Sequence, residues 1–495
     1  SDALYPGSWG RISQDAVMRD FRFVTVELNP IRANPLTGEL VAATDLTVQV
    51  VTDGSDWGPY EIYPVFDLLY RNNLMNYHLL ETGVRSDAEP MLIICHDAFM
   101  ADMAPFVEWK TKRGIDVTMV SSTETGTTSG AIQTYIQNVW ATWNPQPVYI
   151  ILVGDAPQLN PLYGIGSCAS DSMFTLLEGG DLVPDVFISR MSAGNVSELS
   201  PQLDKIMTYE TNPVPGEWLN KFAGLASSEG SGPSDEEYSQ GVEERFLLYN
   251  PDSTADRIYQ SLGHGPTQIS AAVNDGRFWL SYFGHGSGTS WSAPNFTNSN
   301  VDALTNGYMN PFIMDVSCSN GGFDSGSDCF AERWIKYDDG AVGMFSSSTS
   351  CSWHEPAEMA WGVCFSVAGS PDGSMPGGNH LLGQMTLDGI VHMYDVHGTG
   401  SNTEEVMNQY VLFGDCSLLF RSDLTITPDV SHLPTAPMAP MMFEVTVTTG
   451  GAGIEGAYVC AYKDGEVHEV AMTDINGVAM LDIYPQTVGD MIVTV

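Results

Sequence analysis

The sequence predicts an α/β protein built on a mostly parallel sheet, with a small β unit at its N-terminal end and a β-sandwich at its C-terminal end. Short apolar runs alternate with helical patterns through the central part of the chain, which is typical of parallel strands connected by helices. A Pro-rich stretch at residues 433–440 indicates a semi-rigid linker before the last part. With 495 residues and 43% hydrophobic composition, the chain can bury cores in about three domains.

The N-terminal part shows the alternation of β-strands. Residues 21–28 alternate apolar and polar side chains, and an Asn-Pro-Leu-Thr-Gly turn follows at residues 34–38. Residues 45–51 show a second strand pattern. We therefore expect residues 1–86 to form a small antiparallel β unit.

The central part contains apolar runs that are short enough for strands buried on both faces. The expected strands lie at residues 90–95, 148–153, 183–188, 277–283, 311–317 and 341–345, and the expected helices at residues 103–113, 236–249 and 330–337. Functional residues in open α/β sheets follow the carboxyl ends of strands. Beyond the linker, residues 443–447, 457–463, 467–473 and 478–483 alternate around Asp-Gly and Asn-Gly turns, which predicts an immunoglobulin-like β-sandwich.

The charge balance excludes one class of partner. The chain carries 61 Asp and Glu against 19 Lys and Arg, for a formal net charge of -42. A nucleic-acid-binding protein needs clustered Arg and Lys, so we expect no nucleic-acid partner. No run of 18 apolar residues occurs, so we expect no membrane span. The first residues lack a signal-peptide pattern, so we expect a soluble chain whose export signal was removed or lies upstream.

The cysteines show no metal-binding or redox motif. There are eight of them, and no CxxC pair or zinc-type spacing with His is present. Some disulfides are compatible with an oxidising compartment, but the spacing leaves their pairing open.

A histidine and a cysteine follow consecutive buried strands. His285 comes after the strand expected at 277–283, and Cys318 comes after the one at 311–317. If these strands are parallel neighbours, an imidazole and a thiol emerge at the same end of the sheet. A nearby His stabilises a thiolate and later protonates the leaving amine. The backbone N–H groups of Gly286 and Cys318 could form an oxyanion hole.

Around these residues the sequence resembles the gingipain family of cysteine peptidases. The resemblance is carried by Tyr-Phe-Gly-His-Gly-Ser-Gly-Thr-Ser-Trp at 282–291 and Pro-Phe-Ile-Met-Asp-Val-Ser-Cys at 311–318. Further matching stretches lie at residues 152–156, 170–171, 184–190, 304–306, 329–332, 340–342, 345–353 and 411–419. The family usually has Pro in place of Cys416.

This resemblance implies a caspase-like α/β fold in two side-by-side subdomains, residues 87–230 and 231–432, the second with the catalytic His and Cys. It implies that residues 1–86 are the C-terminal part of an N-terminal pro-region and that residues 441–495 are an immunoglobulin-like domain. The pro-region is expected to lie against the peptidase domain as a separate β unit and to be processed near Arg85.

The resemblance also assigns roles to residues. Cys318 matches the nucleophile and His285 the general acid/base. Asp185 matches the acidic residue, Asp or Glu, that orients the His. Trp353 matches an aromatic wall of the primary specificity pocket. The resemblance further implies endopeptidase activity on protein or peptide substrates, a secreted or cell-surface location, and calcium as a structural ion with no cofactor for catalysis.

Other polar residues are weaker candidates. Calcium oxygens could come from Asp155, Asp171, Asp181, Asp328, Asp338 and Asp339, although no EF-hand loop appears. The pairs His96-Asp97 and His354-Glu355 lack a third metal ligand at usable spacing. No buried strand leads into His264, so we expect a loop residue there.

Two other functions stay open on the sequence. The same fold could serve as a sortase-like transpeptidase of a secretion system, which would transfer the acyl group to an amine instead of water. It could also persist as a non-catalytic surface or filament scaffold.

Overall fold

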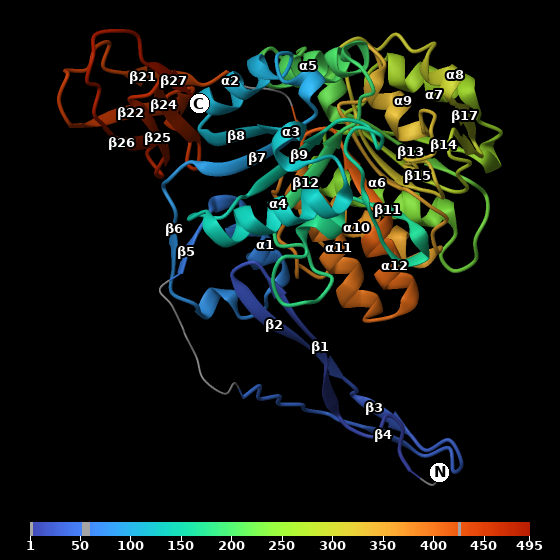
Figure 1. Ribbon diagram of the computed structural model, residues 1–495. Coiled ribbons are helices and arrows are strands. Elements are labelled where there is room, and N and C mark those ends of the chain that lie inside the picture. The colour runs from blue at the N-terminus through green and yellow to red at the C-terminus, as the bar shows by residue number, and fades with distance from the viewer. Residues whose placement is uncertain (1–2, 52–59, 424–426) are drawn as a thin grey trace.

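The computed structural model describes residues 3–51, 60–423 and 427–495, and its centre is a ten-stranded sheet (Figure 1). Neighbouring strands of this sheet are parallel except for β19 and β20, so the expectation of a mostly parallel sheet is confirmed. In spatial order the strands are β14 (Thr254–Tyr259), β13 (Lys221–Ala226), β15 (Trp279–Phe283), β18 (Phe312–Val316), β19 (Gly343–Ser347), β20 (Tyr410–Phe413), β12 (Phe187–Met191), β9 (Tyr149–Val153), β7 (Glu89–Cys95) and β8 (Ile115–Ser121).

The antiparallel step between β19 and β20 divides the sheet into two parallel blocks of opposite direction. The carboxyl ends of β13, β15, β18 and β19 therefore meet at one end of the sheet. The carboxyl ends of β12, β9 and β7 lie at the other end. The expected subdomain boundary near residue 230 stays a prediction.

Helices cover both faces of this sheet because alternate strand residues point to opposite sides. On one face, α2, α6, α10 and α11 bury apolar side chains in a core that includes Trp279 and Phe312. On the other face, α4, α7 and α9 pack in cores that include Ile150, Leu280 and Ile313. The helices are α2 (Ala104–Lys112), α3 (Ser122–Thr125), α4 (Ser129–Thr142), α5 (Val196–Thr211), α6 (Asp235–Tyr249), α7 (Pro266–Asn274), α8 (Asn298–Val301), α9 (Phe330–Lys336), α10 (His354–Ala368), α11 (Leu382–His397) and α12 (Ser401–Gln409). Two short hairpins lie outside the large sheet: β10 (Leu162–Tyr163) pairs with β11 (Ala169–Ser170), and β16 (Ser290–Ser292) pairs with β17 (Asn295–Thr297).

The N-terminal unit is less purely β than expected. The strand expected at 21–28 is confirmed as β2, but residues 45–51 form no strand, and β2 pairs with β1 through a two-residue turn. A helix, α1, is also present, and Pro64 at its first position favours helix initiation. The elements of this unit are β1 (Gly10–Met18), β2 (Phe21–Leu28), β3 (Ile31–Ala33), β4 (Leu40–Ala42), β5 (Tyr60–Ile62), α1 (Pro64–Asn73) and β6 (Thr82–Val84).

The N-terminal unit contacts the main body at two places, while its hairpins extend away from it (Figure 1). At the β1–β2 turn, the buried Arg19 guanidinium donates to the carbonyls of Gln146 and Pro147 and packs over the rings of Phe66 and Trp140. Helix α1 packs against α11. The pro-region expected from the sequence is thus anchored by a cation in one place and by a helix pair in the other.

The C-terminal module is a two-layered β-sandwich, as predicted. One layer contains β21 (Asp429–His432), β22 (Met441–Thr449), β23 (Ala452–Gly453) and β26 (Val478–Ile483), and the other contains β24 (Tyr458–Lys463), β25 (Val467–Met472) and β27 (Ile492–Thr494). Phe443, Val459 and Leu481 are buried between the layers. The Tyr458 hydroxyl donates to the Gly114 carbonyl, which fixes the module beside α2.

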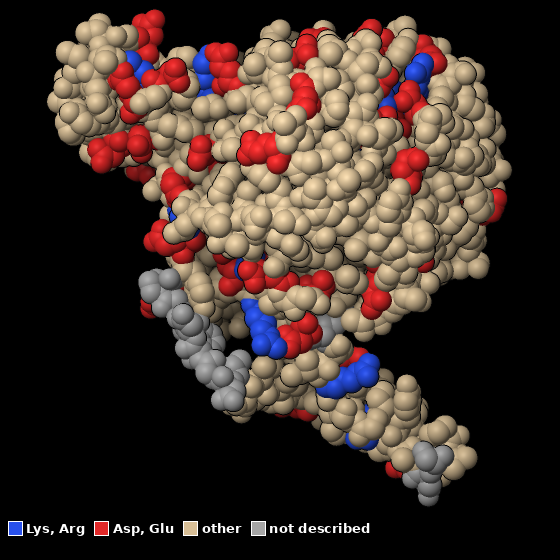
Figure 2. Space-filling model, viewed as in Figure 1, with Lys and Arg blue, Asp and Glu red and all other residues tan. Residues whose placement is uncertain are grey.

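The surface is strongly acidic. Figure 2 shows Asp and Glu side chains spread over the visible face of the main body, with few Lys or Arg among them. Within the described part of the chain, none of the helices has the length and apolar character needed to cross a bilayer.

Candidate active site

Four neighbouring strands lead into loops at the same end of the sheet. The loops after β13, β15, β18 and β19 contain Glu229, His285, Cys318 and Cys351 respectively. Phe283, the last residue of β15, pairs with Val316, the last residue of β18. His285 and Cys318 each follow two residues later, so the two side chains predicted as a pair start from adjacent positions.

The His285 imidazole is held by a carboxylate. Its Nε2 atom lies 3.0 Å from Glu229 Oε2, and both side chains are about half exposed, at 51% and 53%. The Ser227 hydroxyl accepts a hydrogen bond from the Glu229 backbone N–H at 3.1 Å, which steadies the loop. Because Glu229 engages Nε2, Nδ1 is the nitrogen left to exchange a proton with a reacting group.

The Cys318 thiol lies in surroundings that favour its ionised form. The Cys351 thiol donates to it and lowers the pKa of Cys318 to about 6; the Cys351 backbone N–H and the positive charge of His285 act in the same direction, against burial. That N–H lies 3.4 Å from Cys318 Sγ. Because the pKa lies below neutrality, the thiol is largely a thiolate at pH 7, the form that acts as a nucleophile.

A buried carboxylate supports the Cys318 loop from below. Asp315 accepts hydrogen bonds from Trp291 Nε1 at 2.8 Å, Ser317 Oγ at 2.9 Å and Ser346 Oγ at 2.6 Å. Burial raises the pKa of Asp315 to about 6 in spite of these donors. Asn320 Nδ2 in turn donates to Ser317 Oγ at 2.8 Å, so the loop is tied to the strand beneath it.

Gly286 lies where a side chain has no room. A Cβ atom at this position would lie 2.3 Å from the Cys318 carbonyl oxygen. Gly286 bridges to Trp291 through hydrogen bonds donated by the Ser287 and Ser292 amides, so the bridge does not use the Gly286 N–H. The oxyanion hole expected from Gly286 and Cys318 stays a prediction.

Trp353 lies beside both His285 and the Glu229 loop. Its ring stands edge-on to the imidazole, with the centroids 5.4 Å apart at 77°. At Gly230, where φ is +88°, a Cβ would lie 3.2 Å from Trp353 Nε1, so the loop packs closely on the indole. This position is compatible with the predicted wall of a specificity pocket, which stays a prediction.

Asp185 does not contact His285, and its expected role is corrected by the structure. Its carboxylate accepts hydrogen bonds from the backbone N–H groups of Arg19 at 2.8 Å, Leu177 at 2.9 Å and Glu178 at 2.8 Å. Asp185 precedes β12, which lies four strands from β15, or about 19 Å at the usual strand spacing. A side chain cannot cross that distance, so Asp185 anchors the β1–β2 turn instead.

Glu229, not Asp185, is the carboxylate that binds His285. The signal for it is the apolar run at residues 222–226, which becomes β13, directly before Ser-Ser-Glu. The surrounding segment is rich in Gly, Ser and Asp, and that polar character concealed the strand.

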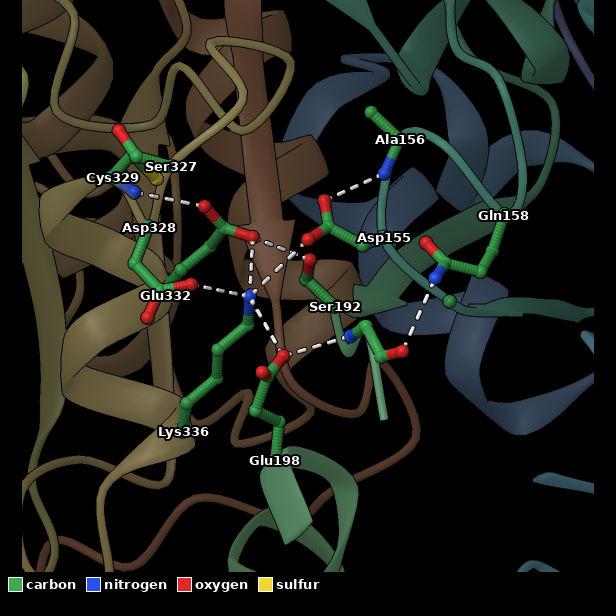
Figure 3. A network of polar contacts seen from close by, with 12 residues as sticks. Asp155, Ala156, Gln158, Ser192, Glu198, Ser327, Asp328, Cys329, Glu332 and Lys336 are labelled. Atoms are coloured by element: carbon green, nitrogen blue, oxygen red, sulfur yellow. Dashed lines mark hydrogen bonds and ion pairs between the residues drawn. The ribbon is translucent and has the colours of Figure 1, made fainter. Parts of the chain in front are cut away.

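Two of the acids proposed for calcium, Asp155 and Asp328, lie beside a lysine instead (Figure 3). Lys336 Nζ lies 3.4 Å from Asp155, 3.4 Å from Glu198, 2.8 Å from Asp328 and 2.9 Å from Glu332. Burial alone would lower the pKa of Lys336, but the carboxylates outweigh it and raise this pKa above its usual value. The ammonium group already supplies the positive charge that these oxygens attract, so Asp155 and Asp328 do not fit a calcium site.

Three of the other four calcium candidates also have protein partners, and Asp338 stays a prediction. Asp171 forms a buried ion pair with Arg190 at 2.6 Å, Asp181 accepts from the Val17 and Val183 amides, and Asp339 accepts from the Gly307 amide. Within the described ranges, no three His, Cys, Asp or Glu side chains form a group that could hold a metal ion.

Two protein-family models match this chain. Residues 85–421 match the model of Peptidase family C25, and residues 1–81 match the model of its propeptide, Propeptide_C25. The chain therefore belongs to Peptidase family C25.

Its relatives include the gingipains of Porphyromonas gingivalis. The chain is 27% identical to Gingipain R2 over 476 residues, which cover 91% of this chain and 63% of that protein. It is 24% identical to Lys-gingipain HG66 over 519 residues, which cover 95% of this chain and 29% of that protein. The chain thus spans less than two thirds of the length of each of these relatives.

Solved structures agree with the sequence resemblance. The complex of the pro- and mature domains of Porphyromonas gingivalis RgpB superposes with a TM-score of 0.74 at 26% identity, covering 80% of this chain and 93% of that one. The crystal structure of the Arg-specific cysteine proteinase gingipain R gives the same TM-score at 25% identity, covering 81% and 92%. The gingipain-like, caspase-like fold expected from the sequence is confirmed. Neither the transpeptidase nor the scaffold alternative gains support.

Proposed function

We propose that this chain is a cysteine endopeptidase, with Cys318 as the nucleophile and His285 as the general acid/base. One observation carries the proposal: a thiol with a pKa of about 6 and a carboxylate-bound imidazole follow paired neighbouring strands at one end of the sheet. Membership of Peptidase family C25 supports the same reaction.

In the first half of the reaction, the Cys318 thiolate attacks the carbonyl carbon of the scissile peptide bond. The resulting oxyanion accepts hydrogen bonds from the Gly286 and Cys318 backbone N–H groups, each typically worth about 3 kcal/mol. His285, through Nδ1, then protonates the leaving amine, and the C–N bond breaks. An acyl thioester on Cys318 remains.

In the second half, water replaces the amine. Neutral His285 takes a proton from the water as its oxygen attacks the thioester carbonyl, and the Cys318 thiolate leaves. Glu229 is a positioning residue in both halves, because its hydrogen bond to Nε2 keeps Nδ1 directed at the reacting groups. Trp353 is proposed to wall the pocket for the substrate side chain. No metal or organic cofactor enters these steps.

The test is peptide hydrolysis by the Cys318→Ala variant. We expect the variant to fold as the parent does and to lose hydrolysis, and we expect iodoacetamide to label Cys318 preferentially in the parent. Unchanged hydrolysis after Cys318→Ala would overturn the proposal. Adding an amine acceptor checks the remaining alternative, because a transpeptidase would form the amide product faster than the acid.

We further propose that the pro-region is cleaved near Arg85 and that the mature enzyme acts outside the cell or at its surface. Arg85 is the first residue of the peptidase match and follows the end of the propeptide match by four residues. It is about one quarter exposed and packs over the Tyr63 ring while paired with Asp87. Its neighbours line a cavity of about 670 Å³ between the two units. The N-terminus of the secreted protein, determined by mass spectrometry, tests both statements.

A further inference from the structure

The eight cysteines fall into two groups. All are free thiols; six are buried, whereas Cys318 and Cys351 are partly exposed. The two accessible thiols are also neighbours in space, because they follow the adjacent parallel strands β18 and β19. A small oxidant in solution would therefore reach these two before the other six.

The contact between the two cysteine loops is close and fixed. The Cys351 N–H lies 3.4 Å from Cys318 Sγ, and the Cys351 carbonyl oxygen lies 3.9 Å from it. Two further hydrogen bonds join the loops, from the Ser319 amide to the Thr349 carbonyl at 2.8 Å and from the Gly321 amide to the Ser347 carbonyl at 2.7 Å. The Cys318 sulfur thus lies against the Cys351 backbone, and the two thiols are within hydrogen-bonding reach of each other.

The two thiols have opposite acid–base character. The pKa of Cys318 is lowered to about 6, chiefly by the hydrogen bond from the Cys351 thiol. The same bond, together with burial, raises the pKa of Cys351 well above its usual value. Among the six buried cysteines, burial raises each pKa. Cys318 is therefore the reactive thiolate, and Cys351 is a protonated thiol in contact with it.

We propose that Cys351 is a resolving thiol, which captures oxidised Cys318 in a reversible disulfide across the active site. This role rests on the proposed function only in that Cys318 is the nucleophile being protected. The Cys351 thiol lowers the pKa of Cys318, but its sulfur forms no bond in the hydrolysis described above, so the role is additional to peptide hydrolysis.

The chemistry needs a peroxide as oxidant. The Cys318 thiolate attacks one oxygen of hydrogen peroxide, the O–O bond breaks, and a sulfenic acid and hydroxide are formed. The Cys351 sulfur then attacks the sulfenic sulfur; the S–OH bond breaks, the Cys351 proton joins the departing hydroxide as water, and the S–S bond forms. An external dithiol returns both cysteines to thiols by exchange.

This disulfide has two consequences for the enzyme. It removes the nucleophile, so activity stops while the oxidant persists. It also withdraws Cys318 from further oxidation to sulfinic and sulfonic acids, which thiols do not reverse. Activity lost to peroxide should therefore return on reduction.

The experiment treats the full chain with hydrogen peroxide and maps its cysteines by mass spectrometry, before and after dithiothreitol. We expect a peptide pair cross-linked through Cys318 and Cys351, lighter by two hydrogens, and recovery of most activity on reduction. In Cys351→Ser we expect sulfinic Cys318 and a large loss of recoverable activity. Cys460→Ala, which removes a thiol from the C-terminal module, should recover as the parent does.

The parent protein alone can refute the idea. Peroxide-treated Cys318 found as sulfinic acid beside a free Cys351 thiol would overturn it, and so would equal recovery in the parent and Cys351→Ser. Mapping needs no substrate, so it stays decisive even if Cys318→Ala retains hydrolysis, a result that would refute the proposed function alone.

Discussion

Glu229 and Asp185 are two carboxylates at the same end of the sheet with different partners: Glu229 binds His285, and Asp185 binds backbone amides near Arg19. We expect Glu229→Gln to lower kcat for peptide hydrolysis by about 100-fold, the lower end of what acid–base catalysis contributes. The reason is that a neutral amide at this position binds the His285 imidazole less strongly than the Glu229 carboxylate does. Steady-state kinetics on a peptide substrate measure the effect.

Asp185→Asn is the matched control for that substitution. It removes the same charge from the same end of the sheet, and we expect kcat to stay within a fewfold of the parent value. A loss as large as that of Glu229→Gln would return the orienting role to Asp185.

The ionisation of Cys318 predicts a pH dependence of its alkylation. The rate of Cys318 labelling by iodoacetamide should rise as pH increases through about 6 and then level off, because the thiolate is the reacting form. In Cys351→Ala the midpoint should move to higher pH, since the thiol that stabilises the thiolate is gone. Quantifying the labelled Cys318 peptide across pH measures both curves, and an unchanged midpoint would contradict the assigned hydrogen bond.

Residues at the site differ in how far the sequence reveals them. His285 and Cys318 are predictable because each follows an apolar run that can only be a buried strand. Predicting Glu229 and Cys351 as site residues requires knowing which strands become neighbours, and local periodicity does not determine strand order. Asp185 illustrates the converse: the family resemblance matched it to the orienting acid, but it precedes β12, which begins at Phe187, and it binds backbone amides instead.

At the scale of elements, the pairing of α1 with α11 holds the pro-region to the main body. The buried Asp388 carboxylate accepts from Asn72 Nδ2 at 3.0 Å and Asn73 Nδ2 at 2.7 Å. Asp388→Ala would leave the Asn72 amide without an acceptor and the Asn73 amide with the Leu69 carbonyl alone, and we expect it to cost about 1 to 3 kcal/mol of stability. Urea unfolding measures the cost.

The same variant should also release the pro-region more readily after cleavage near Arg85, because its helix contact is weakened. Size-exclusion chromatography of the cleaved protein would show this. Asn402→Ala serves as the control, because its hydrogen bond to Glu355 lies on the exposed surface. Equal retention of the pro-region in both variants would show that Asp388 does not anchor it.

About half of the central sheet follows from the sequence, whereas strands β8, β13, β14 and β20 and most of the N-terminal unit do not. Strands such as β7 and β9 are buried on both faces, and their uninterrupted apolar composition marks them. The N-terminal strands are largely exposed, so no apolar pattern separates β1, which forms a strand, from residues 45–51, which do not. Helix α1 is stabilised by its packing on α11, a contact that lies far away in the sequence.

At the scale of the whole molecule, negative charge and buried carboxyls act together on stability. Burial raises the pKa values of Asp185, Asp235, Asp315 and Asp388 to about 6. A carboxyl with a raised pKa stabilises the fold fully below its unfolded value of about 3.9, and the contribution is lost as pH rises through about 6. Partial protonation also reduces the repulsion that comes from a net charge of -42.

We therefore expect the free energy of unfolding to be higher at pH 5 than at pH 7.5, by on the order of a few kcal/mol. Urea unfolding at the two pH values at constant ionic strength measures the difference. Asp315→Asn should reduce it, because that group no longer titrates. A higher stability at pH 7.5 would contradict the assignment of these four groups.

The order of strands β13, β15, β18 and β19 also determines which loops a bound polypeptide substrate contacts in turn. Adjacent strands lie about 4.8 Å apart, while an extended polypeptide advances about 3.4 Å per residue. Loops that follow adjacent strands are therefore spaced by roughly one and a half substrate residues. A polypeptide lying across these strand ends meets the loops bearing Glu229, His285, Cys318 and Cys351 in that sequence, so the direction of the bound polypeptide decides which side of the cut bond each loop contacts.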